Sequence, residues 1–180
     1  MHHPPAEIVT PRLVLRRSRP SDTAARFAFG RDPEVGRYMD WAVLTDIGQL
    51  DGAAERNAAK WNSGEEYAWL ITLPDTDQPI GNISCRIDGH SADFGYLLST
   101  DHWGHGYATE AAQAVFDWLA GLPEIVRIWA TCDTDNAASI RILEKLAMTR
   151  EATLRRWAIR PNLAPGVPRD AHMYVWIRED

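Results

Sequence analysis

A short segment in the middle of the sequence has the residue types that bind phosphate groups. It reads Ser99-Thr100-Asp101-His102-Trp103-Gly104-His105-Gly106-Tyr107-Ala108-Thr109-Glu110 and leads into an apolar run with helical spacing. Gly104 and Gly106 can adopt positive φ and let the backbone approach a ligand closely. The first amides of the following helix lack partners within the helix, and the helix dipole adds to their attraction for anions. The segment therefore predicts a diphosphate site over residues 103–109.

The same segment differs from the common nucleotide-binding loops. It has no lysine at the P-loop position, and it reads G-x-G-x-x-T where a dinucleotide fold has G-x-G-x-x-G. Three strand-like runs precede it, whereas a dinucleotide fold begins with its βαβ unit. A glycine-rich turn that only starts a helix is the plainer alternative.

The elements that would position this loop follow from hydrophobic periodicity and turn residues. Residues 1–11 are expected to be a loose lead-in. Strands are expected over 12–17, 67–73, 79–87, 92–99, 125–132, 151–159 and 172–177, with a Pro/Gly-rich loop at 161–168. Helices are expected from 20–22 onward and over 46–61, 106–120 and 135–146. The predicted fold is α/β (mixed α+β), a mostly antiparallel seven-stranded sheet with helices on its faces. One parallel βαβ unit, at 92–132, carries the loop.

Composition narrows the class of protein. The chain has 180 residues, of which 45% are hydrophobic, so a single domain over 1–180 with its core at about 10–177 is expected. The net charge of −6 argues against nucleic acid as a partner. Cys85 and Cys132 are isolated and are expected to be buried apolar residues in a reducing cytoplasm. Residues 1–7 lack the apolar segment of a secretory signal, and no apolar run reaches the length of a membrane helix.

The loop and several distant motifs resemble the GNAT superfamily of acetyl-CoA-dependent N-acetyltransferases. The family motif is Q/R-x-x-G-x-G/A, and this chain reads Trp103-Gly104-His105-Gly106-Tyr107-Ala108, with tryptophan in the first position. That tryptophan is similar to the ribosomal-protein (Rim-type) branch. Further matches are Thr10-Pro11-Arg12-Leu13-Val14-Leu15-Arg16, Gly81-Asn82-Ile83, Phe94-Gly95-Tyr96-Leu97-Leu98 and the run from Asn136 to Leu146. Ala147-Met148 departs from the usual Gly-Phe.

The resemblance implies acetyl-CoA as co-substrate and assigns the residues that would hold it. The diphosphate would lie against Trp103, Gly104, His105, Gly106, Tyr107, Ala108 and Thr109. The pantetheine arm would pair like an extra strand with the backbone of Tyr96, Leu97 and Leu98. Asn136 and Ser139 share a helix face that would meet the arm, although Asn136 could instead be a helix N-cap. No metal is expected, because His102 and His105 have no third ligand of suitable spacing.

The resemblance also suggests catalytic groups. A backbone N–H near Leu98, where the family strand is bulged, would stabilise the oxyanion. Ser139 would act at the sulfur, since Leu143 occupies the position of the tyrosine found in many relatives; an ordinary surface hydroxyl is the alternative. Glu66 is the first choice of base, with Asp93, His102 and Glu110 as other candidates. Glu110 could instead only offset the helix dipole.

The expected reaction is direct attack of a primary amine on acetyl-CoA in a ternary complex. A protein N-terminal α-amine is one hypothesis for the acceptor, and a small-molecule or antibiotic amine is another. A non-catalytic acyl-CoA sensor and a nucleotide-binding protein are the alternatives to an enzyme. Trp41, Trp61 and Trp69 could line an aromatic acceptor pocket or belong to the core. The protein is expected to be a cytoplasmic monomer or homodimer that binds neither nucleic acid nor membrane.

Overall fold

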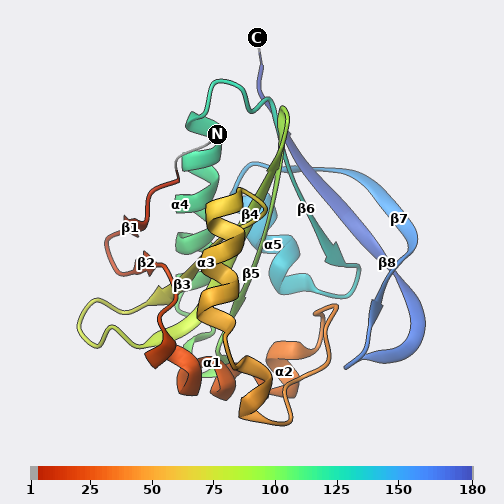
Figure 1. Ribbon diagram of the computed structural model, residues 1–180. Coiled ribbons are helices and arrows are strands. Elements are labelled where there is room, and N and C mark those ends of the chain that lie inside the picture. The colour runs from red at the N-terminus through yellow and green to blue at the C-terminus, as the bar shows by residue number, and fades with distance from the viewer. Residues whose placement is uncertain (1–3, 180) are drawn as a thin grey trace.

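The computed structural model describes residues 4–179, which form an eight-stranded sheet flanked by helices (Figure 1). The strands are β1 (Glu7–Val9), β2 (Val14–Arg16), β3 (Tyr67–Thr72), β4 (Pro79–Asp88), β5 (Ser91–Leu98), β6 (Arg127–Asp133), β7 (Thr149–Arg160) and β8 (Ala164–Ile177). The α-helices are α1 (Thr23–Gly30), α2 (Pro33–Gly36), α3 (Ala53–Ser63), α4 (Tyr107–Gly121) and α5 (Ala137–Lys145). Short 3₁₀ turns are η1 (Pro20–Asp22), η2 (Ile47–Leu50) and η3 (Thr100–His102). The sheet order is β1-β2-β3-β4-β5-β6-β8-β7, and the β5–β6 pair is parallel.

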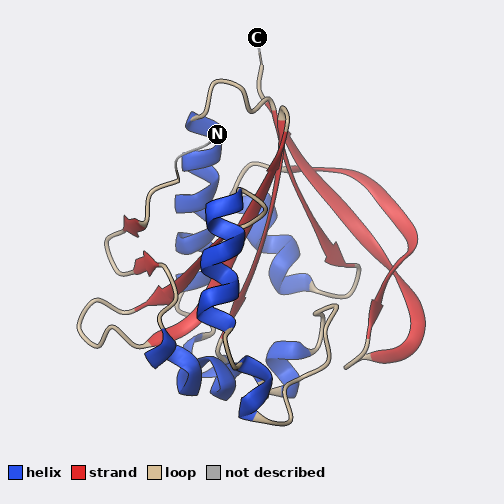
Figure 2. Cartoon of the chain, in the orientation of Figure 1, coloured by secondary structure: helices blue, strands red, loops and turns tan. Residues whose placement is uncertain are grey.

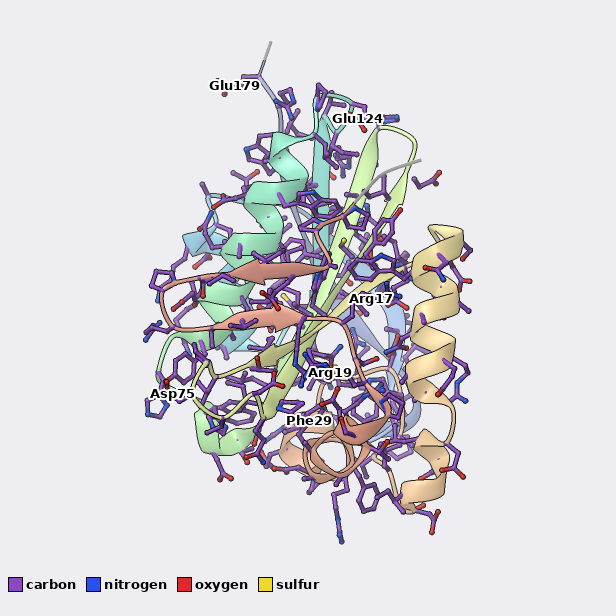
Figure 3. The ribbon with its side chains drawn as sticks, turned by 60° about the vertical axis from the view of Figure 1, so that its left-hand side comes forward. Arg17, Arg19, Phe29, Asp75, Glu124 and Glu179 are labelled. Carbon is purple, nitrogen blue, oxygen red and sulfur yellow. The ribbon has the colours of Figure 1, made fainter. Side chains whose placement is uncertain are left out.

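Helices cover both faces of the sheet, as predicted. Figure 3 shows α3 and α4 on opposite sides of the strands. Helix α4 buries its apolar stripe, Ala111, Ala112, Val115 and Leu119, in one core with Ala92, Phe94 and Leu98 of β5. Helix α5 lies on the same face as α4, because its Glu144 accepts a hydrogen bond from the Tyr174 hydroxyl of β8, and Trp176, two residues along β8, packs edge-on against Phe116 of α4. Alternate residues of the strands therefore face α4 and α5, and the others face the opposite side.

Strands β5 and β6 diverge, and this divergence shapes the middle of the sheet. Their described pairs are Ser91↔Arg127, Ala92↔Ile128 and Asp93↔Trp129. Beyond Asp93 the two strands separate (Figure 1), while β5 stays paired with β4 as far as Leu98. One backbone edge of β5, over residues 94–98, is thus left open toward β6. The place where the two backbones diverge is here called the β5–β6 gap.

The strand count differs from the predicted seven because of β1. It lies within residues 1–11, the expected lead-in, and pairs with β2 through Ile8↔Leu15. Three residues between prolines are too short to show a strand period, so no pattern predicts this strand. The Trp69 indole also donates to the Pro5 carbonyl at 2.9 Å, which ties this segment to β3. Residues 1–3 of the expected lead-in lie outside the described residues.

The hairpin of β7 and β8 is longer than predicted, as Figure 2 shows. A Pro/Gly-rich loop was expected at 161–168, but β8 already begins at Ala164. Pro165 and Pro168 are compatible with a strand here because β8 pairs with β6 only from Ala171 onward. A proline on a free edge removes no ladder hydrogen bond. The expected loop at 164–168 is therefore wrong, and the true turn is residues 161–163.

The N-terminal helical region also divides more finely than predicted. The expected helix at 46–61 is split into η2 and α3 by Gly52, which has φ +66°. Helix α2 was not predicted; it begins at Pro33 and is capped by Asp32, whose side chain accepts from the Glu34 amide. Cys85 and Cys132 are free and buried, as predicted. Within the described residues, no helix is long and apolar enough to cross a membrane.

Candidate active site

Two cavities open on opposite faces of the sheet and meet at the gap between β5 and β6. The first, here called the loop cavity, has a volume of about 620 Å³ and lies between the 102–109 loop, α2, the end of β5 and the start of α5. Most residues predicted to bind the cofactor line it: Tyr96, Leu97, Leu98, Trp103, Gly104, Gly106, Tyr107, Ala108, Thr109, Asn136 and Ser139. His105 does not; its ring stacks on Tyr107 with centroids 5.6 Å apart.

The geometry of the loop agrees with the chemistry that its glycines predict. Gly104 and Gly106 both have φ +79°, in the left-handed region that favours glycine. Gly106 is the N-cap of α4 and supplies no side chain to cap the first amides of the helix. The Trp103 indole donates to the Leu98 carbonyl at 2.8 Å, which folds the loop back over the end of β5. The free amides therefore face a cavity next to the open edge of β5.

An ion-paired network holds the N-terminal arm against the start of α4. Glu110 accepts from the Thr10 hydroxyl at 2.7 Å, from the Arg12 amide at 2.9 Å and from Arg12 Nε at 2.6 Å. Arg12 also donates to the His105 carbonyl. Burial alone raises the pKa of Glu110, but these hydrogen bonds outweigh it and the pKa is lowered. Glu110 is thus a structural carboxylate that stabilises the loop.

Helix α5 brings two predicted residues to the gap. The Asn136 side chain accepts from the Ser139 amide at 3.2 Å, so the N-cap role of Asn136 is confirmed. Its amide group remains available to a ligand, and both Asn136 and Ser139 line both cavities. Leu143, on the same helix face, is buried.

Tyr96 contributes a side chain that the sequence analysis did not use. Its hydroxyl is buried and forms no hydrogen bond with any described residue. Burial raises the pKa of this phenol, and the neighbouring Ser139 side chain offsets that effect only in part. Tyr96 lines both cavities. The phenol is therefore a protonated group at the gap, beside Ser139.

The second cavity, here called the hairpin cavity, has a volume of about 500 Å³. Its floor is formed by β4, β5 and β6, its roof by residues 38–41 and one wall by the β7–β8 hairpin. It shares Tyr38, Met39, Tyr96, Leu97, Asn136 and Ser139 with the loop cavity. Strand residues on its floor, such as Asp93, Trp129 and Thr131, belong to the face turned away from α4. Two ligands entering from opposite sides of the sheet would meet at the shared residues.

Comparison with known proteins identifies the family. A family model described as an acetyltransferase (GNAT) domain matches residues 12–149. An N-acetyltransferase of Bacillus subtilis named YoaA is 30% identical over 172 residues, which cover 94% of this chain and 95% of the relative. The chain belongs to the GNAT acetyltransferase family. The predicted enzyme class, an acetyl-CoA-dependent N-acetyltransferase, is confirmed.

Solved structures confirm the GNAT fold. RimL, a ribosomal L7/L12 α-N-protein acetyltransferase in complex with coenzyme A, is similar with a TM-score of 0.81 and 22% identity, covering 94% of this chain and 96% of RimL. The microcin C7 self-immunity acetyltransferase MccE, in complex with acetyl-CoA and AMP, has a TM-score of 0.85 and 20% identity, covering 97% of this chain and 98% of MccE. Acetyl-CoA as co-substrate agrees with the ligands of these neighbours.

The candidate bases of this GNAT chain fall into two groups. Glu66 and Asp93 line the hairpin cavity, whereas His102 lines the loop cavity and Glu110 is held in the Arg12 network. Glu66 accepts from the Ser84 hydroxyl at 2.9 Å and from Lys60 at 3.0 Å. Asp93 is paired with Arg86 at 2.7 Å. Of the four candidates, Glu66 and Asp93 are therefore the two that line the hairpin cavity.

The tryptophans of the GNAT chain divide into core residues and residues that line the hairpin cavity. Trp61 and Trp69 pack edge-on with ring centroids 5.0 Å apart, and Trp69 is fully buried, so they belong to the core. Trp41 lines the hairpin cavity, one of the two roles considered for it, together with Trp129 and Trp157, which the sequence analysis missed. Trp129 lies on the same face of β6 as Thr131, so the alternation of strand residues could have placed it there. No pattern in the sequence places the hairpin residue Trp157 in the cavity.

Two further expectations need correction or addition. The bulge expected near Leu98 is not present in the described β4–β5 ladder, whose register runs without a shift from Gly81↔Leu98 to Asp88↔Ser91. A Cβ on Gly81 would lie 2.3 Å from the Leu97 carbonyl, so the glycine permits close strand contact here.

The cations Arg37, Arg141 and Lys145 line the loop cavity and were not predicted. Among residues 4–179, no group of three or more His, Cys, Asp or Glu side chains is arranged to hold a metal ion.

Proposed function

We propose that the chain transfers the acetyl group of acetyl-CoA to a primary amine by direct attack in a ternary complex. The donor would occupy the loop cavity and the acceptor amine the hairpin cavity. The observation that carries this proposal is that the two cavities lie on opposite faces of the sheet and share Tyr96, Leu97, Asn136 and Ser139 at the β5–β6 gap. Such an arrangement holds two reactants side by side without a covalent enzyme intermediate.

The donor would be held by backbone groups and a few cations. The open edge of β5 over Tyr96, Leu97 and Leu98 would pair with the amide groups of the pantetheine arm. The α4 amides behind Gly104 and Gly106 would bind the diphosphate. Arg141 and Lys145 are one helical turn apart on α5 and would face the phosphate groups. The Asn136 side-chain amide would bond the arm near the gap.

The chemistry at the gap would use groups that the fold holds in place. The amine nitrogen attacks the thioester carbon, a backbone N–H near Leu98 stabilises the oxyanion, and the C–S bond then breaks. The Tyr96 phenol and the Ser139 hydroxyl would donate hydrogen bonds to the departing sulfur. Because an ordinary thiol has a pKa of about 8.5, the thiolate is a fair leaving group and needs only modest assistance.

The amine must lose a proton before or during attack, because an alkylamine has a pKa of about 10. Glu66 would accept that proton through water in the hairpin cavity, and Asp93 is the second carboxylate in reach of the same cavity. The contacts of Glu66 with Lys60 and Ser84 fix its position.

Two kinds of acceptor remain as hypotheses from the resemblance. RimL is named for a protein α-amine and MccE for self-immunity to a microcin. A feature of this chain favours a small amine: the hairpin that forms one wall of the cavity is fastened at its turn to the 36–43 segment. The Asn162 side chain donates to the Gly36 and Trp41 carbonyls at 2.7 and 2.8 Å and accepts from the Val43 amide at 3.0 Å.

The test measures the CoA released from acetyl-CoA when primary amines and short peptides are supplied as acceptors. A thiol reagent detects the free CoA. We expect release that depends on the amine, with intersecting double-reciprocal plots as a ternary complex requires. Parallel plots would contradict direct attack and indicate an acetylated enzyme. CoA binding without turnover on any acceptor would instead support the acyl-CoA sensor.

A further inference from the structure

The wall of the hairpin cavity contains a buried positive charge that the acetyl transfer described above does not use. Arg160, at the end of β7, is 8% exposed and lines the hairpin cavity. Its Nε is buried and has no hydrogen-bond partner among the described residues. A buried guanidinium without a counter-ion is costly, because the charge has left water without compensation.

The other buried or half-buried charges of the cavity already have partners. Glu66 is paired with Lys60, and Asp93 is paired with Arg86. Asp133 receives two hydrogen bonds from Arg169, at 2.7 and 2.9 Å, and one from the Asp135 amide. Asp40 is exposed. Arg160 is thus the one buried cation of the described cavity lining that forms no ion pair.

The local structure holds Arg160 in this position. It stands next to the turn that contains Asn162, and Asn162 is fastened to the 36–43 segment by three hydrogen bonds. The charge of Arg160 acts within the cavity. Burial raises the pKa of Asp133, but the hydrogen bonds from Arg169 and the charges of Arg169 and Arg160 outweigh it. The backbone of Arg160 is therefore next to a fastened turn, and its buried guanidinium lines the cavity.

We propose that Arg160 binds an anionic group of the acceptor, so that the substrate is a small amine that also carries a carboxylate or a phosphate. This inference rests on the proposed function, because it assumes that the amine lies at the Ser139 end of the same cavity. An anion at Arg160 would supply the hydrogen-bond partner that Nε lacks and would orient the amine toward the gap. The aromatic side chains of Trp129 and Trp157 would enclose the part between the two groups.

The first test compares pairs of primary amines that are matched except for an anionic group. Glycine and glycinamide form the carboxylate pair, and phosphoethanolamine and ethanolamine form the phosphate pair. In at least one pair the anionic amine should have a kcat/KM about tenfold higher or more, as expected for a charge-assisted hydrogen bond. Equal rates within both pairs, or a preference for short peptides without an anionic group, would overturn the proposal.

The second test uses variants of the cavity wall. Arg160→Met should abolish the preference for the anionic acceptor and leave the KM for acetyl-CoA unchanged, and Arg160→Lys should retain part of it. Arg155→Met, which removes an exposed arginine of the same strand, is the matched control and should keep the preference. A preference that persists in Arg160→Met would contradict the assignment.

A binding measurement separates this proposal from the proposed function. Intrinsic tryptophan fluorescence is titrated with N-acetylglycine and with N-acetylglycinamide, which are products of the carboxylate pair, and with O-phosphoryl-N-acetylethanolamine and N-acetylethanolamine. Tighter binding of an anionic product by the wild type, lost in Arg160→Met, supports the subsite even if no acceptor is turned over. Turnover with no anion preference and no anion binding would contradict the anion subsite but not the proposed acetyl transfer.

Discussion

Tyr96 and Ser139 bring two hydroxyl groups to the place where the thioester would be cleaved. Ser139 could be predicted from the sequence, because the run from Asn136 to Leu146 has a recognisable spacing on one helix face. The role of Tyr96 could not be predicted in the same way. Its strand period shows which face it takes, but only the divergence of β6 leaves its phenol buried without a partner at the gap.

Replacing these hydroxyls should slow the chemical step more than it weakens donor binding. For Tyr96→Phe and Ser139→Ala we expect kcat to fall about tenfold each, which is less than a typical acid–base contribution because a thiolate leaves readily. The KM for acetyl-CoA should change by less than about threefold, since each variant keeps most of the surface that touches the arm. Initial rates with saturating acceptor give both values.

The control for this pair is Tyr174→Phe, which removes a hydroxyl bonded to Glu144 away from both cavities. It should leave kcat unchanged. If Tyr96→Phe and Ser139→Ala both retained wild-type kcat, neither hydroxyl would act on the sulfur. If KM for acetyl-CoA rose as much as kcat fell, their role would be to position the donor.

The β7–β8 hairpin shows which elements sequence patterns can and cannot predict. The βαβ unit that carries the loop was predicted correctly. The hydrophobic periods of its strands and helix, and the glycines between them, can be read from neighbouring residues. The start of β8 was not, because Pro165 and Pro168 suggest a loop unless the free edge of the strand is known. The hairpin wall of the cavity, with Trp157 and Arg160, depends on that long-range pairing and was therefore missed.

Of the two substrates, only the acceptor should bind more weakly when the hairpin is released from the 36–43 segment. Asn162→Ala removes three hydrogen bonds and leaves the Gly36 and Trp41 carbonyls and the Val43 amide without them. We expect a loss of about 1–3 kcal/mol in the free energy of unfolding. We also expect the KM for the acceptor to rise about fivefold or more. A hairpin that is mobile in the free enzyme must become ordered when the acceptor binds, and this ordering costs free energy.

Urea unfolding and initial-rate kinetics test this prediction. Asn57→Ala, which loses one long contact with Ser18, serves as the control and should leave the acceptor KM unchanged. A rise in the KM for acetyl-CoA equal to that for the acceptor would contradict a division of the site into two cavities.

Over the whole molecule, two cavities lined by different elements of one sheet meet at the β5–β6 gap. The fold class, the helices on both faces and the parallel unit were predictable, because they follow from periods and short connections. The gap was not, because the sequence of β6 looks like that of any buried strand. The donor loop depends only on local residues, and its glycines have the positive φ that their types predict.

The most direct test of this account is the titration of CoA into the protein by isothermal calorimetry. We expect a sub-millimolar Kd for the wild type and a Kd about tenfold higher or more for Gly106→Val, because valine does not readily keep the φ of +79° that presents the first α4 amides to the diphosphate. Gly89→Val places the same side chain at a positive-φ glycine in the β4–β5 turn and should bind CoA as the wild type does. Circular dichroism and melting confirm that each variant is folded. An equal Kd for wild type and Gly106→Val, or no binding by the wild type, would contradict the assignment of the loop to coenzyme A.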